Sequence, residues 1–141
     1  MGSSGACRTI AGTERDAYQV WDGSNGVSQR DSAQPVPNLC CMEELSVSWG
    51  AYLGQFLAVY SELGSTAIEM RTAPAPNGPW SEPFTIERAP GSLLMSAWAR
   101  EQPELSLGGG RRLIISYSQS LKPGSFGIGT FLAEVTQTKS P

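Results

Sequence analysis

The stretch that decides the fold is residues 54–61, GQFLAVYS, together with a counterpart at residues 111–118, RRLIISYS. Each is an apolar run of strand-forming residues that ends in Tyr-Ser. Continuous runs of this kind are typical of strands that are buried on both faces. Two copies of one pattern in a chain of 141 residues predict a repeated β unit.

Strand signals on both sides of the first run predict a four-stranded unit. Residues 45–49 (LSVSW) and 67–72 (AIEMRT) alternate between apolar and polar side chains, and residues 83–86 (PFTI) follow as a short strand. Residues 73–79 (APAPNGP) form a turn that no helix would tolerate. We therefore expect an up-and-down meander of four strands.

The same pattern returns further along the chain. The tripeptide Glu-Leu-Ser at residues 44–46 recurs at 104–106, so residues 104–107 are expected to form the first, innermost strand of a second meander. Residues 127–135 are its third strand, and residues 17–23 and 35–36 resemble the last two strands of an earlier copy. A four-stranded unit that recurs every roughly 50–60 residues is typical of a β-propeller blade.

The predicted fold class is therefore all-β, with about two and a quarter propeller blades where closed propellers typically have at least four. We expect part of a larger propeller, or a unit that self-associates through its open blade faces; a β-sandwich is the alternative. The predicted organisation is an irregular N-terminal leader (1–16), a partial blade (17–37), a full blade (44–87), a partial blade (102–136) and a C-terminal tail (137–141).

Composition excludes several classes of function. The net charge is −3 and no basic cluster is present, which argues against nucleic acid as a partner. No apolar stretch is long enough to span a membrane, and the N-terminus has no signal-peptide pattern. The chain has no histidine, so histidine-based nucleophile activation and zinc motifs are excluded, and carboxylates are the remaining acid–base groups. Cys7, Cys40 and Cys41 form no CxxC pair, and neither a metal nor another cofactor is expected.

Several short motifs carry a resemblance to a known family. Residues 18–23 (YQVWDG), 52–56 (YLGQF), 71–74 (RTAP), 78–81 (GPWS) and 103–105 (PEL) resemble the C-terminal blades of five-bladed propellers similar to the glycoside hydrolase family 43 and 32 clan, the furanosidase type. The branch that they resemble is bacterial and usually secreted, and its members are described only as a domain of unknown function. The resemblance implies a carbohydrate-active protein and a secreted or cell-surface location.

The resemblance also bears on catalysis. In enzymes of this clan the nucleophile or base comes from the first blade, and no such blade is recognisable in this chain. We therefore expect a glycoside-hydrolase-like protein whose present portion is inactive on its own. The alternative is a non-catalytic propeller module that binds saccharide or supports an assembly.

Two glutamates are the candidate catalytic residues. Glu44 and Glu104 precede the two predicted innermost strands, whose ends meet at one mouth of a propeller axis. Glycoside hydrolysis needs such a carboxylate pair on either side of the scissile bond. Glu43 is the alternative to Glu44 as the candidate residue if the strand begins one residue earlier. The alternative is structural, with each glutamate accepting hydrogen bonds from a neighbouring loop.

Aromatic and cationic side chains near the same strands are the candidate ligand-binding residues. Trp49 follows one predicted inner strand and Trp98 leads into the other, so either indole suits stacking on a sugar ring, with core packing as the alternative. Arg100 and Glu101, next to Trp98, would add the polar contacts that a sugar hydroxyl needs, and Glu43 is a further candidate ligand-binding residue. Trp80 lies at a turn and is expected in the core, as are the apolar residues of the two central runs.

Overall fold

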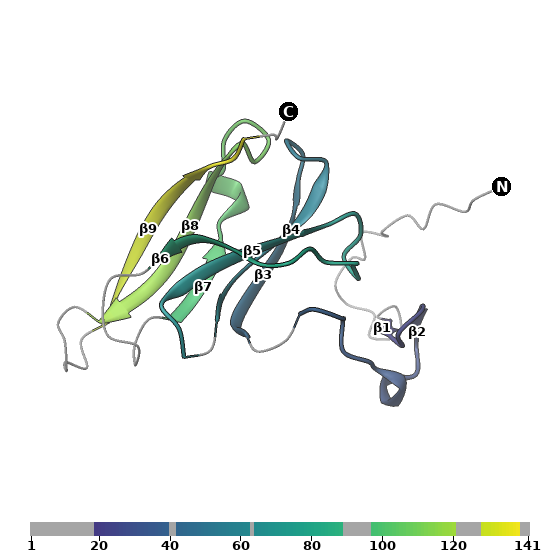
Figure 1. Cartoon of the computed structure of the whole chain (residues 1–141). Helices are drawn as coiled ribbons and strands as arrows, with labels where there is room; N and C mark the ends of the chain where they lie inside the picture. The colour runs from purple at the N-terminus through teal and green to yellow at the C-terminus, as the bar shows by residue number, and fades with distance from the viewer. Residues whose placement is uncertain (1–18, 40–41, 63, 89–96, 121–127, 139–141) are drawn as a thin grey trace. The chain divides into compact units, whose positions relative to one another are not determined.

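The computed structural model describes residues 19–39, 42–62, 64–88, 97–120 and 128–138, in two compact units, Met1–Val36 and Pro37–Pro141 (Figure 1). Each unit is described by itself below. The predicted leader (1–16) and the three cysteines lie outside the described residues.

The first unit contains a small antiparallel hairpin. Strand β1 (Val20–Trp21) pairs with β2 (Gly26–Val27), and the carboxylate of Asp22 accepts hydrogen bonds from two backbone N–H groups of the turn between them. These bonds favour the ionised carboxylate and lower the pKa of Asp22. The prediction of a strand at residues 35–36 is wrong, because the partner of β1 follows immediately through this carboxylate-capped turn.

The second unit begins with a complete four-stranded meander. Its strands are β3 (Met42–Gly50), β4 (Gln55–Glu62), β5 (Ala67–Ala73) and β6 (Phe84–Arg88), paired antiparallel in chain order. Strand β3 alternates between half-buried and exposed residues, whereas β4 is buried along most of its length. The difference follows from position, since β3 is an edge strand of the sheet and β4 is central.

A three-stranded meander follows, and one of its strands corrects the sequence prediction. Its order is β7 (Ala97–Glu101), β8 (Arg112–Ser120) and β9 (Ile128–Thr136). The expectation of an inner strand at residues 104–107 is wrong: residues Pro103–Leu105 form a 3-10 turn, η3, and β7 takes the first place in the sheet. Proline lacks the N–H that a strand partner needs and fits the start of a helical turn.

The repeat of the two apolar runs is real. Strands β4 and β8 are each the second strand of their sheet, as the match between residues 54–61 and 111–118 predicts. In that match Tyr60 corresponds to Tyr117. The two meanders therefore share their central strand pattern although their first strands differ.

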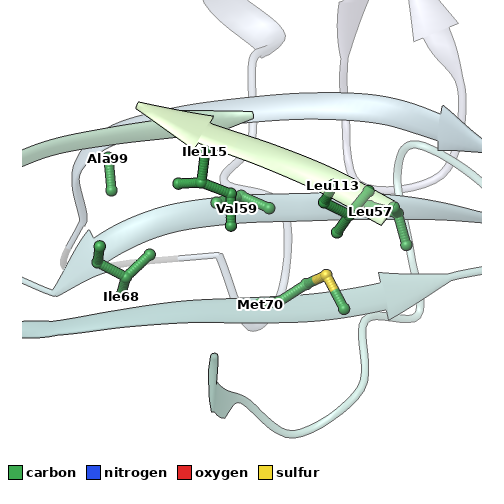
Figure 2. Packing of buried hydrophobic residues seen from close by; sticks show 7 residues of the cluster. All are labelled: Leu57, Val59, Ile68, Met70, Ala99, Leu113 and Ile115. Atoms are coloured by element: carbon green, nitrogen blue, oxygen red, sulfur yellow. The ribbon is translucent and has the colours of Figure 1, made fainter. Parts of the chain in front are cut away.

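The two meanders pack against each other through one apolar face each. Seven residues form the core: Leu57, Val59, Ile68 and Met70 from the four-stranded sheet, and Ala99, Leu113 and Ile115 from the three-stranded sheet (Figure 2). Burying a side chain such as Leu or Ile stabilises the fold by about 1.5–3 kcal/mol. This shared core makes the stability of each sheet depend on the other.

Most of the predicted core residues are buried, and two are not. Leu57, Val59, Trp80, Leu113 and Ile115 are buried as expected. Phe56 and Ile114 are only half-buried. Ile114 points to the face of β8 opposite to Leu113 and Ile115, which enter the core between the sheets. Phe56 lies near the start of β4, where burial is incomplete, whereas Ala58 and Tyr60 further along the same face are buried.

The all-β prediction is confirmed. The residues that the structure describes form antiparallel sheets and short 3-10 turns, with no α-helix. No helix long and apolar enough to cross a bilayer is found among them. The sheets are blade-like, and within the described ranges they form no closed ring.

Candidate functional site

A buried carboxylate lies in the seam between the first strands of the two sheets. Glu101, at the end of β7, is only 4% exposed. One of its carboxylate oxygens accepts a hydrogen bond from the Ser48 hydroxyl of β3, and the other accepts one from Ser106, 3.3 Å away. Its backbone N–H donates to the Ser46 hydroxyl at 2.7 Å. Three serines therefore hold Glu101 in place.

The hydrogen-bond network continues from this seam into the rest of the three-stranded sheet. The Ser106 hydroxyl also accepts a bond from the backbone N–H of Ile114, and Gln102 donates from its side chain to Ser116 at 2.7 Å. These bonds join β7, η3 and β8 into one polar layer. Because hydrogen bonds to a charged group are stronger than those between neutral groups, Glu101 ties the two sheets together at their inner edge.

Beside the buried carboxylate lies a solvent-accessible ion pair. The guanidinium of Arg100 on β7 is 3.5 Å from a carboxylate oxygen of Glu44 on β3. Both side chains keep substantial exposure, and exposed pairs of this kind contribute only about 0–1 kcal/mol to stability. The pair therefore places a donor and an acceptor at the surface without being required for folding.

Trp98 has an unusual backbone conformation next to this pair. Its φ is +63°, in the left-handed region that residues other than glycine rarely adopt. The register between β7 and β8 shifts between Ala97 and Arg100, which marks a β-bulge, and the indole is 50% exposed. A bulge redirects the side chain that it carries. Here an aromatic ring is exposed to solvent on the same strand as Arg100, two residues before it in the sequence.

The other predicted site residues lie in different surroundings. Glu104 is exposed in η3, so its expected equivalence to Glu44 on an inner strand is wrong. Glu43 is exposed on β3. Trp49, at the far end of β3, is 54% exposed and its ring makes an edge-on contact with Phe56 at 5.0 Å. The structure thus brings together Glu44 and Arg100 of the predicted set.

The RTAP and GPWS motifs form a structural cluster on β4 and β5. The Arg71 guanidinium donates to the Tyr60 hydroxyl and to the backbone carbonyl of Ser81, at 2.9 and 2.8 Å. Tyr60 in turn donates to the carboxylate of Glu69 at 2.9 Å. These contacts attach the loop before β6 to the sheet, and Trp80 is buried beneath that loop's end as expected.

Burial has an electrostatic consequence in this cluster. It raises the pKa of the Tyr60 hydroxyl to about 12, because a phenolate would lose its hydration there. The nearby carboxylate of Glu69 adds to the rise, and the cation of Arg71 opposes it. Tyr60 therefore stays protonated and donates to Glu69 throughout the physiological range.

The sequence predicted Glu101 only as a polar contact for a sugar hydroxyl, and it did not predict the serines that surround the carboxylate. Ser46 and Ser48 share one face of β3, and this spacing of two residues marks a polar row on a strand. Their role becomes visible only when β7 is known to lie against that face. The alternation of serine with apolar residues along β3 was visible in the sequence, but it does not say which strand lies against the serine face.

Comparison with models of protein families gives one match. The model of the domain of unknown function DUF4185 matches residues 8–125, which is most of the chain. The chain belongs to the DUF4185 family. The DUF4185 match includes the hairpin, the four-stranded meander and the inner seam, and it ends before β9. No curated protein matches the chain.

Proposed function

We propose that this chain is the propeller portion of a carbohydrate-active protein, similar to the glycoside hydrolases of the family 43 and 32 clan, and that on its own it binds saccharide without cleaving it. The observation that carries the proposal is Trp98, an exposed indole in a left-handed backbone conformation. Such a conformation costs about 1–3 kcal/mol, persists only where the surrounding structure holds it, and is found most often at functional sites.

The surroundings of Trp98 supply what a sugar ring needs. The indole face stacks on the C–H surface of the ring. Arg100, two residues further along β7, and its ion-pair partner Glu44 on β3 provide a hydrogen-bond donor and acceptor for the hydroxyl groups of the sugar. We assign Trp98, Arg100 and Glu44 to one saccharide site, with Glu43 on the same strand as an outer contact.

Binding is favoured over hydrolysis by the chain alone. A glycosidase pair needs two accessible carboxyl groups, about 5–9.5 Å apart, on either side of the bond. Glu101 is buried and engaged by two serine hydroxyls, Glu44 is paired with Arg100, and Glu104 lies on η3 outside the inner strands. In a longer five-bladed protein, Glu44 and Glu104 would be contributors to a site completed by other blades.

A titration with neutral oligosaccharides tests the proposal. We expect a neutral furanose or pyranose tetrasaccharide to shift the backbone amide resonances of residues 98–101, and Trp98→Ala to weaken binding by about tenfold, the effect of losing an aromatic anchor. Trp49→Ala is the matched control, since Trp49 has similar exposure on a regular strand. Equal losses in the two variants, or no binding to any sugar, would contradict the proposal.

A second candidate, self-association, rests on a separate observation. Leu45, Val47 and Trp49 follow one another on the same exposed face of β3, which gives an apolar row on an edge strand. Rows of this kind often mark an interface. A concentration-dependent mass in light scattering, lowered by Val47→Lys, would support this function; a monomer at all concentrations would refute it.

The cellular location that we propose rests on the same resemblance to the glycoside hydrolase family 43 and 32 clan. A saccharide-binding protein of the secreted type would meet its ligand outside the cell, so we propose a secreted or cell-surface location. Fractionation of the native host would test it, with the protein expected in the medium or on the cell surface. Recovery in the cytosol alone would refute it.

A further inference from the structure

A hollow between the outer parts of the two sheets lies apart from the residues discussed so far. It has a volume of about 550 Å³, which is within the range of small-molecule sites, about 300–1,000 Å³. Its walls come from β4, β5 and β6 of one sheet and from the end of β9 in the other. Met70 of the shared core also contributes to its lining.

The hollow exists because the two sheets differ in their number of strands. The four-stranded sheet ends in β6, and in the described part of the chain the three-stranded sheet ends in β9. Phe84 of β6 is directly opposite Met70 in the strand register and so points to the core side of its sheet. Phe84 nevertheless remains 46% exposed, and Ile86 is half-buried. An apolar wall therefore faces solvent inside a concave site.

The opposite part of the lining is polar but uncharged. Gln55, Thr72 and Thr136 line the hollow, and their side chains make no hydrogen bond among the described residues. Gln137 is fixed at one end, because its side-chain amide donates to the carbonyl of Gly110 at 2.7 Å. None of the lining residues carries a formal charge.

We propose that this hollow is a second saccharide subsite, for one or two neutral sugar units. An apolar wall with an aromatic ring suits the C–H face of a sugar, and amide and hydroxyl groups on the other side suit its hydroxyls. A charged sugar is disfavoured, because a carboxylate placed there would lose part of its hydration and would find no cation among the described lining residues. The proposal rests on the saccharide specificity proposed above but on different residues.

Amide resonances of the whole chain, titrated with cellotetraose, nystose and tetragalacturonate, test the subsite. We expect both neutral tetrasaccharides to shift Thr72, Phe84 and Ile86, and tetragalacturonate to leave them in place. Phe84→Ala should weaken this response by about tenfold. Leu132→Ala, at an exposed position on the outer face of β9, is the matched control and should leave it unchanged.

The outcomes separate the two proposals. Shifts confined to Trp98 and Arg100 would overturn the subsite and leave the inner site standing. Shifts in the hollow that persist unchanged in Trp98→Ala, with none at the seam, would support the subsite and refute the inner site. Equal binding of tetragalacturonate, or no binding of any probe, would overturn the subsite. Since Phe84 is substantially exposed, loss of folding in Phe84→Ala is not expected, and Phe84→Leu provides a milder second variant.

Discussion

The two meanders of the second unit have equivalent second strands and unlike first strands. Strand β3 is nine residues long, and after a register shift between Met42 and Leu45 it pairs regularly with β4 as far as Gly50. Strand β7 has only five residues, its register shifts between Ala97 and Arg100, and Trp98 within that shift has a left-handed backbone conformation. Both strands carry an exposed indole, Trp49 on β3 and Trp98 on β7, but only β7 contributes a buried carboxylate, Glu101, and a tryptophan with a left-handed backbone conformation. The difference indicates that the repeated part of the pattern builds the core and that the departure from it builds the candidate site.

The largest expected effect tests whether the two sheets depend on one core. Leu57→Ala in β4 and Leu113→Ala in β8 should each lower the free energy of unfolding by about 2–5 kcal/mol, since both side chains are fully buried between the sheets. Urea denaturation measures the loss. Ile114→Ala is the control, because Ile114 is half-buried on the other face of β8 and should cost less than Leu113→Ala.

Independent sheets would give a different result. If the three-stranded sheet contributed little to stability, Leu113→Ala would cost less than about 1 kcal/mol while Leu57→Ala kept its full effect. That outcome would show that the meanders fold separately.

The central strands were predictable because their signal is local. An apolar run such as residues 56–60 needs no partner to be recognised as a buried strand, and its copy at residues 113–117 identifies the repeat. The four strands of the first meander follow from alternation and from the proline-rich turn. The hydrophobic pattern and the turn residues agree in this region, so local sequence patterns are enough to predict the observed order of the strands.

The first strand of the second meander was not predictable in the same way. The recurrence of Glu-Leu-Ser pointed to residues 104–106, but Pro103 begins a 3-10 turn there and β7 precedes it. Strand β7 is short and bulged, so it has no clean alternation to read. The seam around Glu101 depends on which strand lies beside β3, a long-range fact that no local pattern contains.

The next prediction compares two nearby glutamates of the three-stranded region. Glu101→Ala should lower the free energy of unfolding by about 1–3 kcal/mol, because it leaves the hydroxyls of Ser48 and Ser106 without their acceptor. Glu104→Ala, at an exposed position on η3, should change it by less than about 0.5 kcal/mol. Chemical denaturation at pH 7 measures both, and equal losses would show that Glu101 does not link the sheets.

A smaller effect, the loss of stability at alkaline pH, distinguishes Tyr60 from Tyr117, its equivalent in the repeat. Burial raises the pKa of Tyr60 to about 12, while a tyrosine in the unfolded chain titrates near 10. The unfolded chain therefore loses this proton first, so the contribution of Tyr60 to stability is complete below pH about 10 and is lost as the pH rises toward about 12. Unfolding at a series of pH values should show a shallower fall in Tyr60→Phe than in the wild type.

Tyr117→Phe is the control for this alkaline series. Tyr117 holds the equivalent position in the repeat, and its ring stacks on Phe131 at 5.8 Å, outside any network like that of Arg71 and Glu69. This variant removes a tyrosine hydroxyl but leaves the contacts of Tyr60 with Arg71 and Glu69 intact, so the alkaline loss that Tyr60 causes should remain. If Tyr60→Phe kept it as well, Tyr60 would not be responsible for the alkaline loss.

The smallest expected change in stability concerns the two exposed tryptophans. Its sign shows whether the left-handed conformation at Trp98 lowers the stability of the protein. Trp98→Gly should raise the free energy of unfolding by about 1 kcal/mol, because glycine adopts φ near +63° without the clash that other residues suffer there. Trp49→Gly should lower it by about 0.5–1 kcal/mol, because glycine weakens a regular strand. Urea denaturation of both variants, together with the oligosaccharide titration, checks the comparison. A variant at position 98 that is more stable and no longer binds sugar would show that the bulge maintains the binding site at the expense of stability, whereas destabilisation by both substitutions would show that the indole of Trp98 serves only packing.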